Sequence, residues 1–293
     1  MSAKFLESFG GKLAEQWVAT LLTPALVFWA GGAAAGLQRF GWTTISTWFN
    51  HQPEPLQVAL LVAAFCLIAA SAFVVQRFDL PVLRFLEGYW HPWFRPLRRW
   101  FIAKEARRSQ RISDRWQTLT NLNPNQLTAE SRDELVQLDW QQLHIPLPNH
   151  LMPTRLGNIL RAAEQRPLEK YGLDAIVCWS RLWLLLPDAV KKDLQDARAD
   201  LNTAARVWLW SLLFIVWTAL GAWWAAPIGI LSVIFTYYYW ALDAARTYGE
   251  LIEATFDLHR HLLYQSLRWN LPADPAVERR VGQELTRYLW RGY

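Results

Sequence analysis

The side chains best suited to bind an anion lie in one basic and aromatic segment of the chain. Between residues 77 and 116, arginine and lysine residues alternate with tryptophans, and prolines divide the segment into short pieces. Guanidinium groups pair with phosphate oxygens, and indole rings favour the headgroup layer of a bilayer. We therefore expect anionic lipid headgroups or another anionic ligand to bind at Arg95, Arg98, Arg99, Lys104, Arg107 and Arg108. The alternative is that these cations only fix membrane topology, because they directly follow an apolar stretch.

Polar side chains within apolar stretches form two further groups of candidates. The first group lies between residues 153 and 187, where we predict a buried polar cluster or a ligand site at Asn158, Tyr171, Asp174 and Arg181. The second group lies in and beside the longest apolar stretch, where we predict a pore lining and gate at Thr218, Ser232, Thr236, Asp243 and Arg246. The alternative for the hydroxyl groups is a hydrogen bond back to the backbone of their own helix.

The sequence offers little for catalysis or metal binding. Glu253, Asp257 and His261 share one helical face, a spacing that a metal ion could use, but a solvated helix face has the same pattern. The motifs HExxH, GxxxxGKS/T, GxGxxG and GxSxG are absent from the sequence. The apolar residues around Cys178 favour a buried structural thiol over a Cys–His dyad. We therefore expect no metal, no cofactor and no enzymatic activity.

The elements that must position these residues are apolar helices. The 293-residue chain is 53% hydrophobic and 19% charged, and its mean hydropathy is +0.02. The charges are unevenly spread, since residues 16–38, 55–76 and 207–242 contain no charged side chain. A helix of about 20 apolar residues crosses a bilayer core. The predicted fold class is therefore all-α: an integral membrane protein with four transmembrane helices and a helical cytoplasmic domain.

The apolar stretches predict the boundaries of the four helices. The first two spans are expected at residues 17–37 and 56–75. The stretch 207–242 would be about 54 Å long as one helix, which is too long for one crossing. Because Ala226-Pro227-Ile228-Gly229 is a breaker sequence, we predict a hairpin of two spans, residues 207–225 and 228–245. The predicted divisions are a cytoplasmic N-terminal segment (1–16), helices 1 and 2 (17–75), a cytoplasmic helical domain (76–206), helices 3 and 4 (207–245) and cytoplasmic C-terminal helices (246–293).

The positions of the basic residues predict the topology. Arg39 is the only Lys or Arg in the two loops on one side of the membrane, and all the others lie on the opposite side. Because basic loops remain in the cytoplasm, both termini are predicted to be cytoplasmic, in a multi-pass protein of the bacterial inner membrane. The alternative for the first apolar stretch is a cleaved signal peptide, with Lys4 and Lys12 before it and a cleavage site at Ala33-Ala34-Ala35.

Local signals refine the helical regions. Thr128 and Thr154 are predicted helix N-caps, and Pro275 is predicted to open the last helix. Asp188 begins a helix whose apolar residues recur at spacings of four and three, and this helix continues into the third span. In the first span, Gly32 and Gly36 form a GxxxG pattern that predicts close helix packing, either within one subunit or between copies.

Residues 153–187 resemble a segment of uncharacterised multi-span bacterial membrane proteins. The resemblance rests on Thr154-Arg155-Leu156-Gly157-Asn158 and Tyr171-Gly172-Leu173-Asp174-Ala175, followed by Trp179, Arg181 and Leu182. It covers about an eighth of the chain. The resemblance implies that this cytoplasmic segment is a specialised element, and it implies neither an activity nor a catalytic residue.

These observations favour a membrane channel or a membrane-disrupting effector, assembled as a homo-oligomer and gated by its cytoplasmic helical domain. Four spans are few for a monomeric transporter, and the first three contain no ionisable side chain apart from Cys66. One alternative is a membrane scaffold or receptor that recruits a soluble partner through the basic segment or the C-terminal helix. Another is a membrane-bound enzyme acting on lipid. The expected partners are anionic lipids, further copies of the chain, and a cytoplasmic protein or a nucleotide, with no sequence-specific nucleic acid.

Overall fold

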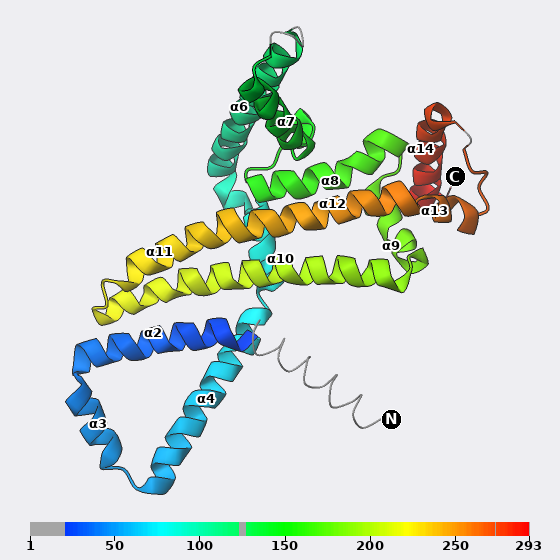
Figure 1. Ribbon diagram of the computed structural model, residues 1–293. Helices are drawn as coiled ribbons and strands as arrows, with labels where there is room; N and C mark the ends of the chain where they lie inside the picture. Colours follow the sequence, from blue (N-terminus) through cyan, green and yellow to red (C-terminus); the bar gives the residue numbers. More distant parts are fainter. Residues whose placement is uncertain (1–20, 123–126, 273, 293) are drawn as a thin grey trace. The chain divides into compact units, whose positions relative to one another are not determined.

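Helices make up all the regular structure in the described part of the chain (Figure 1). The computed structural model describes residues 21–122, 127–272 and 274–292, and no strand occurs among them. The all-helical part of the predicted fold class is therefore confirmed. Three helical segments, Glu54–Gln76, Asp188–Leu220 and Ala225–His259, are long and apolar enough to cross a membrane.

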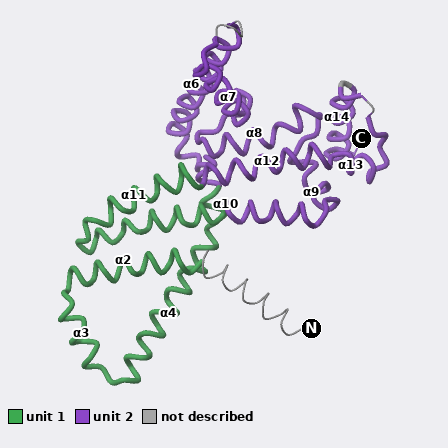
Figure 2. Tube along the Cα trace, in the orientation of Figure 1, with its two compact units in different colours: residues 1–83, 202–240 green, residues 84–201, 241–293 purple. Residues whose placement is uncertain are grey.

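The chain divides into two compact units, and neither unit is one continuous stretch (Figure 2). Unit 1 comprises residues 1–83 and 202–240, and unit 2 comprises residues 84–201 and 241–293. Helix α10 (Asp188–Phe214) contributes residues to both units. So does the segment that begins with α11 (Ala225–Phe235) and ends with α12 (Leu242–His259). Each segment thus joins an apolar half in unit 1 to a more polar half in unit 2.

Unit 1 consists of apolar helices around small clusters of buried side chains. Its elements are α2 (Thr23–Phe40), α3 (Trp42–Asn50), α4 (Glu54–Gln76), the end of α10 with the 3-10 segment η5 (Ile215–Leu220), α11 and the start of the π-helical segment η6 (Thr236–Ala241). Most of α4 is open, since Leu61 and Phe65 are 64% and 59% exposed. An exposed apolar surface of this length is typical of a helix that faces lipid or another chain.

A buried ion pair inside unit 1 joins the start of α5 (Asp79–Glu87) to α10. The Asp79 carboxylate accepts hydrogen bonds from Nε and Nη2 of Arg206, and the Nε–Oδ1 distance is 3.0 Å. The two side chains are only 15% and 7% exposed. Because buried charges are stable only when paired, this contact holds the chain that follows α4 against α10.

The turn between the third and fourth apolar helices lies earlier than the sequence predicts. Segment η5 ends at Gly221, whose φ of +89° is a left-handed conformation that glycine adopts without strain. Helix α11 begins at Ala225, so Pro227 lies in its first turn. Backbone N–H groups in a first helical turn have no helical acceptor, so proline is tolerated there. The predicted break at residues 226–229 is therefore wrong, because these residues open a helix.

The first predicted span is described only from residue 21, so residues 17–20 lie outside the described part of the chain. Helix α2 makes close contacts through Gly31 and through Gly32, which is one member of the predicted GxxxG pair. A Cβ atom on Gly32 would lie 2.4 Å from the Trp217 ring, and one on Gly31 would lie 2.3 Å from the Phe214 ring. A Cβ atom on Gly36 would meet nothing within 4 Å, so Gly36 takes no part in this packing.

Unit 2 is a helical assembly in which α8 lies along α12 and α6 along α7 (Figure 1). Its helices are α6 (Arg95–Thr120), α7 (Ala129–Leu143), α8 (Arg155–Tyr171), α9 (Ala175–Leu185), α12, α13 (His261–Ser266) and α14 (Pro275–Arg291), with the end of α5, the first half of α10 and the short 3-10 segments η2 (Pro92–Phe94) and η4 (Pro148–His150). The predicted N-caps are confirmed, since the Thr128 and Thr154 hydroxyls accept backbone N–H groups of α7 and α8. The predicted starts of α10 and α14 are confirmed too.

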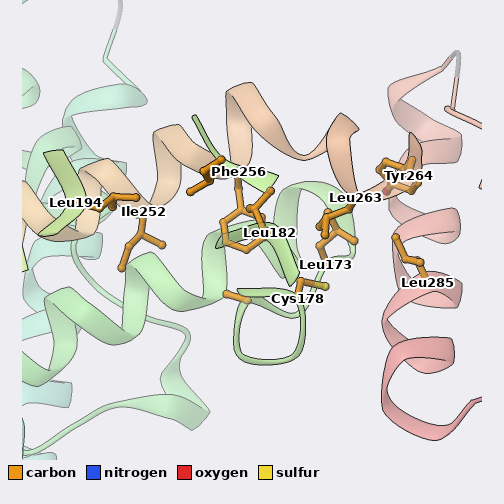
Figure 3. Packing of buried hydrophobic residues seen from close by; sticks show 11 residues of the cluster. Leu173, Cys178, Leu182, Leu194, Ile252, Phe256, Leu263, Tyr264 and Leu285 are labelled. Atoms are coloured by element: carbon orange, nitrogen blue, oxygen red, sulfur yellow. The ribbon is translucent and has the colours of Figure 1, made fainter. Parts of the chain in front are cut away.

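The core of unit 2 gathers apolar side chains from helices that are far apart in sequence (Figure 3). Leu173 and Leu182 lie beside Phe256 and Leu263, and α14 adds Leu285. Val281 and Leu289, on the same face of α14, also pack against this cluster. The backbones also approach closely, because a Cβ atom on Gly282 would lie 1.9 Å from the carbonyl oxygen of Tyr171. The core therefore joins the end of the chain to α8 and α9.

Candidate functional site

Three arginines from different helices line one small cavity in unit 2, which we call the arginine pocket. Arg108 belongs to α6, Arg155 to the first turn of α8 and Arg246 to α12. Helix α7 contributes Trp140 and His144 to the same lining. The cavity has a volume of about 60 Å³. Four helices must therefore be packed correctly before these cations meet.

The lining of the arginine pocket carries more positive than negative charge. Its carboxylate, Glu105, faces three guanidinium groups. Burial and the nearby charges of Arg155 and Arg246 lower the pKa of the Arg108 guanidinium, while Glu105 opposes this effect. Like charges in a partly desolvated cavity repel each other more strongly than they do in water. The arrangement therefore favours an anion in the pocket.

Hydrogen bonds fix the polar side chains of the arginine pocket. Glu105 Oε2 accepts from Nη1 of Arg108 and from Nδ2 of Asn158, each at 3.4 Å. The Asn158 side chain is nearly buried, and its Oδ1 accepts the backbone N–H of Met152 at 2.7 Å. Because that bond sets the orientation of the amide, the NH₂ group points toward Glu105. Asn158 and Arg108 thus bind the same carboxylate oxygen of Glu105.

Helix α7 positions the arginine that α12 contributes. The Arg246 guanidinium carbon lies 4.8 Å from the centroid of the Trp140 ring, within the range of a cation–π contact. Its nearest carboxylate, on Asp243, is 3.9 Å away and mostly exposed, so this ion pair adds little. The Trp140 ring also contacts the His144 ring. Stacking on Trp140, rather than the ion pair, therefore holds Arg246 in place.

The six predicted anion-binding residues all lie on α6, but only Arg108 lines the arginine pocket. Arg98 is half-buried, and the exposed members are Arg95, Arg99, Lys104 and Arg107. Lys104 Nζ lies 5.6 Å from the centroid of the Trp100 ring, and both side chains are exposed. The N-terminal part of α6 therefore presents an exposed surface of aromatic and basic side chains that is separate from the arginine pocket.

The four residues of the predicted polar cluster have separate partners. Asn158 belongs to the arginine pocket, and the Tyr171 hydroxyl donates to Oδ1 of Asp257 at 2.6 Å. Asp174 caps α9 by accepting the backbone N–H groups of its first turn, and Arg181 donates to a backbone carbonyl one turn earlier. These hydrogen bonds do not join the four residues into one site, because each serves the helix end or helix contact beside it.

The candidate pore residues divide between the two units. In unit 1 the Thr218 hydroxyl donates to the Ile215 carbonyl, the Ser232 and Ser211 hydroxyls lie 2.7 Å apart, and Thr236 is buried. Thr218 and Ser232 thus bond within one subunit, as hydroxyls in apolar helices commonly do. In unit 2, Asp243 is exposed and Arg246 lines the arginine pocket.

The residues considered for metal binding and nucleophilic chemistry have structural partners. Asp257 accepts from Tyr171 and from Lys170, and His261 Nδ1 lies 3.0 Å from the Leu258 carbonyl. Across residues 21–122, 127–272 and 274–292, no group of three His, Cys, Asp or Glu side chains could hold a metal ion. Burial raises the pKa of the Cys178 thiol to about 11, so the group is protonated and inert at neutral pH.

Sequence reasoning missed Glu105, Trp140, His144 and Arg155 of the arginine pocket, and it missed one ion pair. Arg155 lies directly after a predicted N-cap and inside the Thr154–Asn158 segment, and that position is the one signal that could have singled it out. Trp140 and the Asp79–Arg206 pair carry no comparable signal, because their partners are distant in sequence.

Searches against protein-family models, curated proteins and solved structures find no match to the chain.

Proposed function

We propose that this protein is an oligomeric membrane channel or membrane-disrupting effector whose state is controlled at the arginine pocket. The observation that carries the proposal is the position of Arg246. This residue lies on α12, little more than one helical turn after η6 ends at Ala241. The same uninterrupted segment begins with the apolar helix α11. A ligand that moves Arg246 therefore acts on a helix that enters the membrane, and no catalytic step is required.

The π-helical segment η6 is the element that suits this coupling. A π-helical turn is a rare and less stable geometry, and such turns are frequent at functional sites. The six residues Thr236–Ala241 separate α11 from α12. A shift between π-helical and α-helical hydrogen bonding here changes which residues of α11 share a face. A change in the contacts of Arg246 would thereby change the orientation of the apolar helix α11.

The proposed membrane arrangement has four spans and a cytoplasmic helical domain. Helix α2 supplies the fourth span beside the three long apolar segments. All but Arg39 of the 30 Lys and Arg residues then lie on one side. This side is the cytoplasm of an inner membrane by the positive-inside rule, and both termini lie there.

Conduction in this proposal requires several copies of the chain. The hydroxyl groups of Thr218 and Ser232 bond inside one subunit, so a single subunit offers few groups to line a water-filled path. The apolar surface of α4 is largely open. We propose that part of this surface packs against neighbouring copies and part against lipid.

Planar bilayer recording of the purified full-length protein tests the proposal. We expect discrete currents from the wild type and a change of at least threefold in open probability for Arg246→Gln. The matched control is Arg287→Gln, which changes an exposed arginine on α14 outside the pocket. Absence of current at all voltages and anion concentrations, from a protein that is monomeric by native mass spectrometry, contradicts the channel.

A scaffold or receptor is the second candidate, favoured by the exposed aromatic and basic surface of α6. The C-terminal helix suits partner recruitment less well, because its apolar face is part of the core. In this case a stoichiometric soluble partner co-purifies with the wild type. The charge reversals Lys104→Glu and Arg107→Glu release it, while Arg287→Glu does not. Currents that persist in these variants without any partner would exclude the scaffold as the main role.

A further inference from the structure

We propose that the arginine pocket binds a phosphate monoester dianion, with Arg108, Arg155 and Arg246 as the three cationic contacts. The control of membrane activity by this ligand rests on the proposed function, but the binding itself does not. The ligand is defined by its terminal group, which either a soluble phosphate compound or a lipid with a phosphomonoester headgroup can supply. Three lines of argument, from volume, charge and geometry, lead to this class.

The volume of the arginine pocket limits what can enter it. Pockets that enclose a whole drug-sized ligand have volumes of about 300–1,000 Å³, so a cavity of about 60 Å³ accepts only a small group. A terminal phosphate group is of this size, whereas a whole nucleotide or sugar is much larger. The remainder of the ligand must therefore extend beyond the cavity, where the half-exposed ring of Trp140 is available for contact.

The charge of the pocket matches a dianion better than a monoanion. Three guanidinium groups and one carboxylate line it, so the fixed charges leave an excess of about two positive charges. Charge-assisted hydrogen bonds between guanidinium and phosphate are among the strongest polar contacts in proteins. A phosphomonoester carries close to two negative charges at neutral pH. Such a ligand would neutralise the excess and relieve the repulsion between the arginines.

The geometry presents donors from several directions. Arg108 and Arg155 come from α6 and α8, and Arg246 comes from α12. A guanidinium group has five N–H donors, so the bond from Arg108 to Glu105 leaves further donors on the same group. The planar fork of each arginine suits the tetrahedral arrangement of phosphate oxygens. Glu105 and Trp140 hold two of the three arginines in orientation, so the site is largely pre-organised.

Isothermal titration calorimetry of the full-length protein in an uncharged detergent tests the site. Inorganic phosphate is titrated at constant ionic strength, and bicelles of phosphatidylcholine with or without phosphatidic acid form the lipid arm. The matched pair of variants is Arg108→Gln and Arg107→Gln, because these adjacent arginines of α6 undergo the same change of charge and only Arg108 lines the pocket. We expect one saturable site per chain, at least tenfold weaker in Arg108→Gln and within twofold of wild type in Arg107→Gln.

The outcomes are distinct. Saturable binding of inorganic phosphate that Arg108→Gln alone weakens supports the site with a soluble ligand. Binding seen only with phosphatidic acid bicelles, and again weakened by Arg108→Gln alone, supports a headgroup ligand. No saturable binding in either arm, or equal weakening by the two variants, overturns the proposal.

Two further measurements separate the possible causes of failure. If circular dichroism shows that Arg108→Gln does not fold, Arg246→Gln replaces it, because that side chain is partly exposed at the pocket. If phosphate binds but does not change the conductance, the proposed control of the membrane segment is contradicted, whereas the proposed binding site is supported.

Discussion

Removing one partner of the buried ion pair between Asp79 and Arg206 should cost more stability than removing one partner of an exposed ion pair in the described part of the chain. The side chains are 15% and 7% exposed, and two hydrogen bonds join them. Removing one partner of a buried pair leaves the other charge in a medium that solvates it poorly, at a typical cost of 3–5 kcal/mol. Both side chains keep a little solvent contact, so we expect Asp79→Asn to lower the free energy of unfolding by about 3 kcal/mol.

Denaturant unfolding of the detergent-solubilised protein, followed by tryptophan fluorescence, measures this change. The control is Asp188→Asn, since the Asp188 carboxylate is fully exposed in its pair with Lys191 and its loss should have a much smaller effect on the free energy of unfolding. A double variant, Asp79→Leu with Arg206→Met, should recover most of the loss, because apolar replacement of a buried pair is often close to neutral. A loss for Asp79→Asn no greater than for the control would refute the reasoning.

Three other predictions follow from packing and protonation. Gly32→Ala should destabilise unit 1, because its Cβ would lie 2.4 Å from the Trp217 ring, whereas Gly36→Ala should be neutral or stabilising by up to about 1 kcal/mol in the same unfolding assay. Cys178, with its pKa raised by burial to about 11, should react with N-ethylmaleimide about a hundredfold more slowly than an ordinary thiol, as followed by mass spectrometry; rapid labelling of the folded protein would contradict this. Burial raises the pKa of Glu87 above 4.5, so the folded state binds protons more tightly than the unfolded state, and stability should rise as pH falls through the folded-state pKa. Melting temperatures of Glu87→Gln should therefore depend less on pH than those of the wild type, and an equal dependence would count against the assignment.

Local patterns predicted local structure well in this chain. The helix starts at Asp188 and Pro275 and the caps at Thr128 and Thr154 follow from side-chain types at a few positions. The predicted hairpin turn at residues 226–229 differs from the observed one because Pro and Gly occur both in turns and inside helices. Proline either breaks a helix or occupies its first turn, and only the left-handed backbone at Gly221 decides which applies here.

The candidate site was predictable only in fragments. Arg108, Asn158 and Arg246 were each singled out, but in three separate predictions, because α6, α8 and α12 are far apart in sequence. Their meeting depends on how four helices pack, and no spacing rule within one helix contains that information. The four residues of the predicted polar cluster have separate partners for the converse reason. Tyr171 and Asp174 are close in sequence, which suggests a shared site, but the Tyr171 hydroxyl binds Asp257 and the Asp174 carboxylate binds the backbone of α9.

The interleaved order of the two units has a consequence for how the chain is made. Residues 202–240 emerge from the ribosome after most of unit 2 but before its final portion, residues 241–293. Until that portion arrives, Leu173 and Leu182 have none of the cover that Phe256, Leu263 and Leu285 give them. Some fifty residues must therefore be translated after residue 240 while the apolar side chains of the incomplete unit 2 core remain exposed to water. A nascent chain in this condition is a natural client for a holding chaperone, and loss of α14 would remove the cover that Leu285 provides from every finished copy.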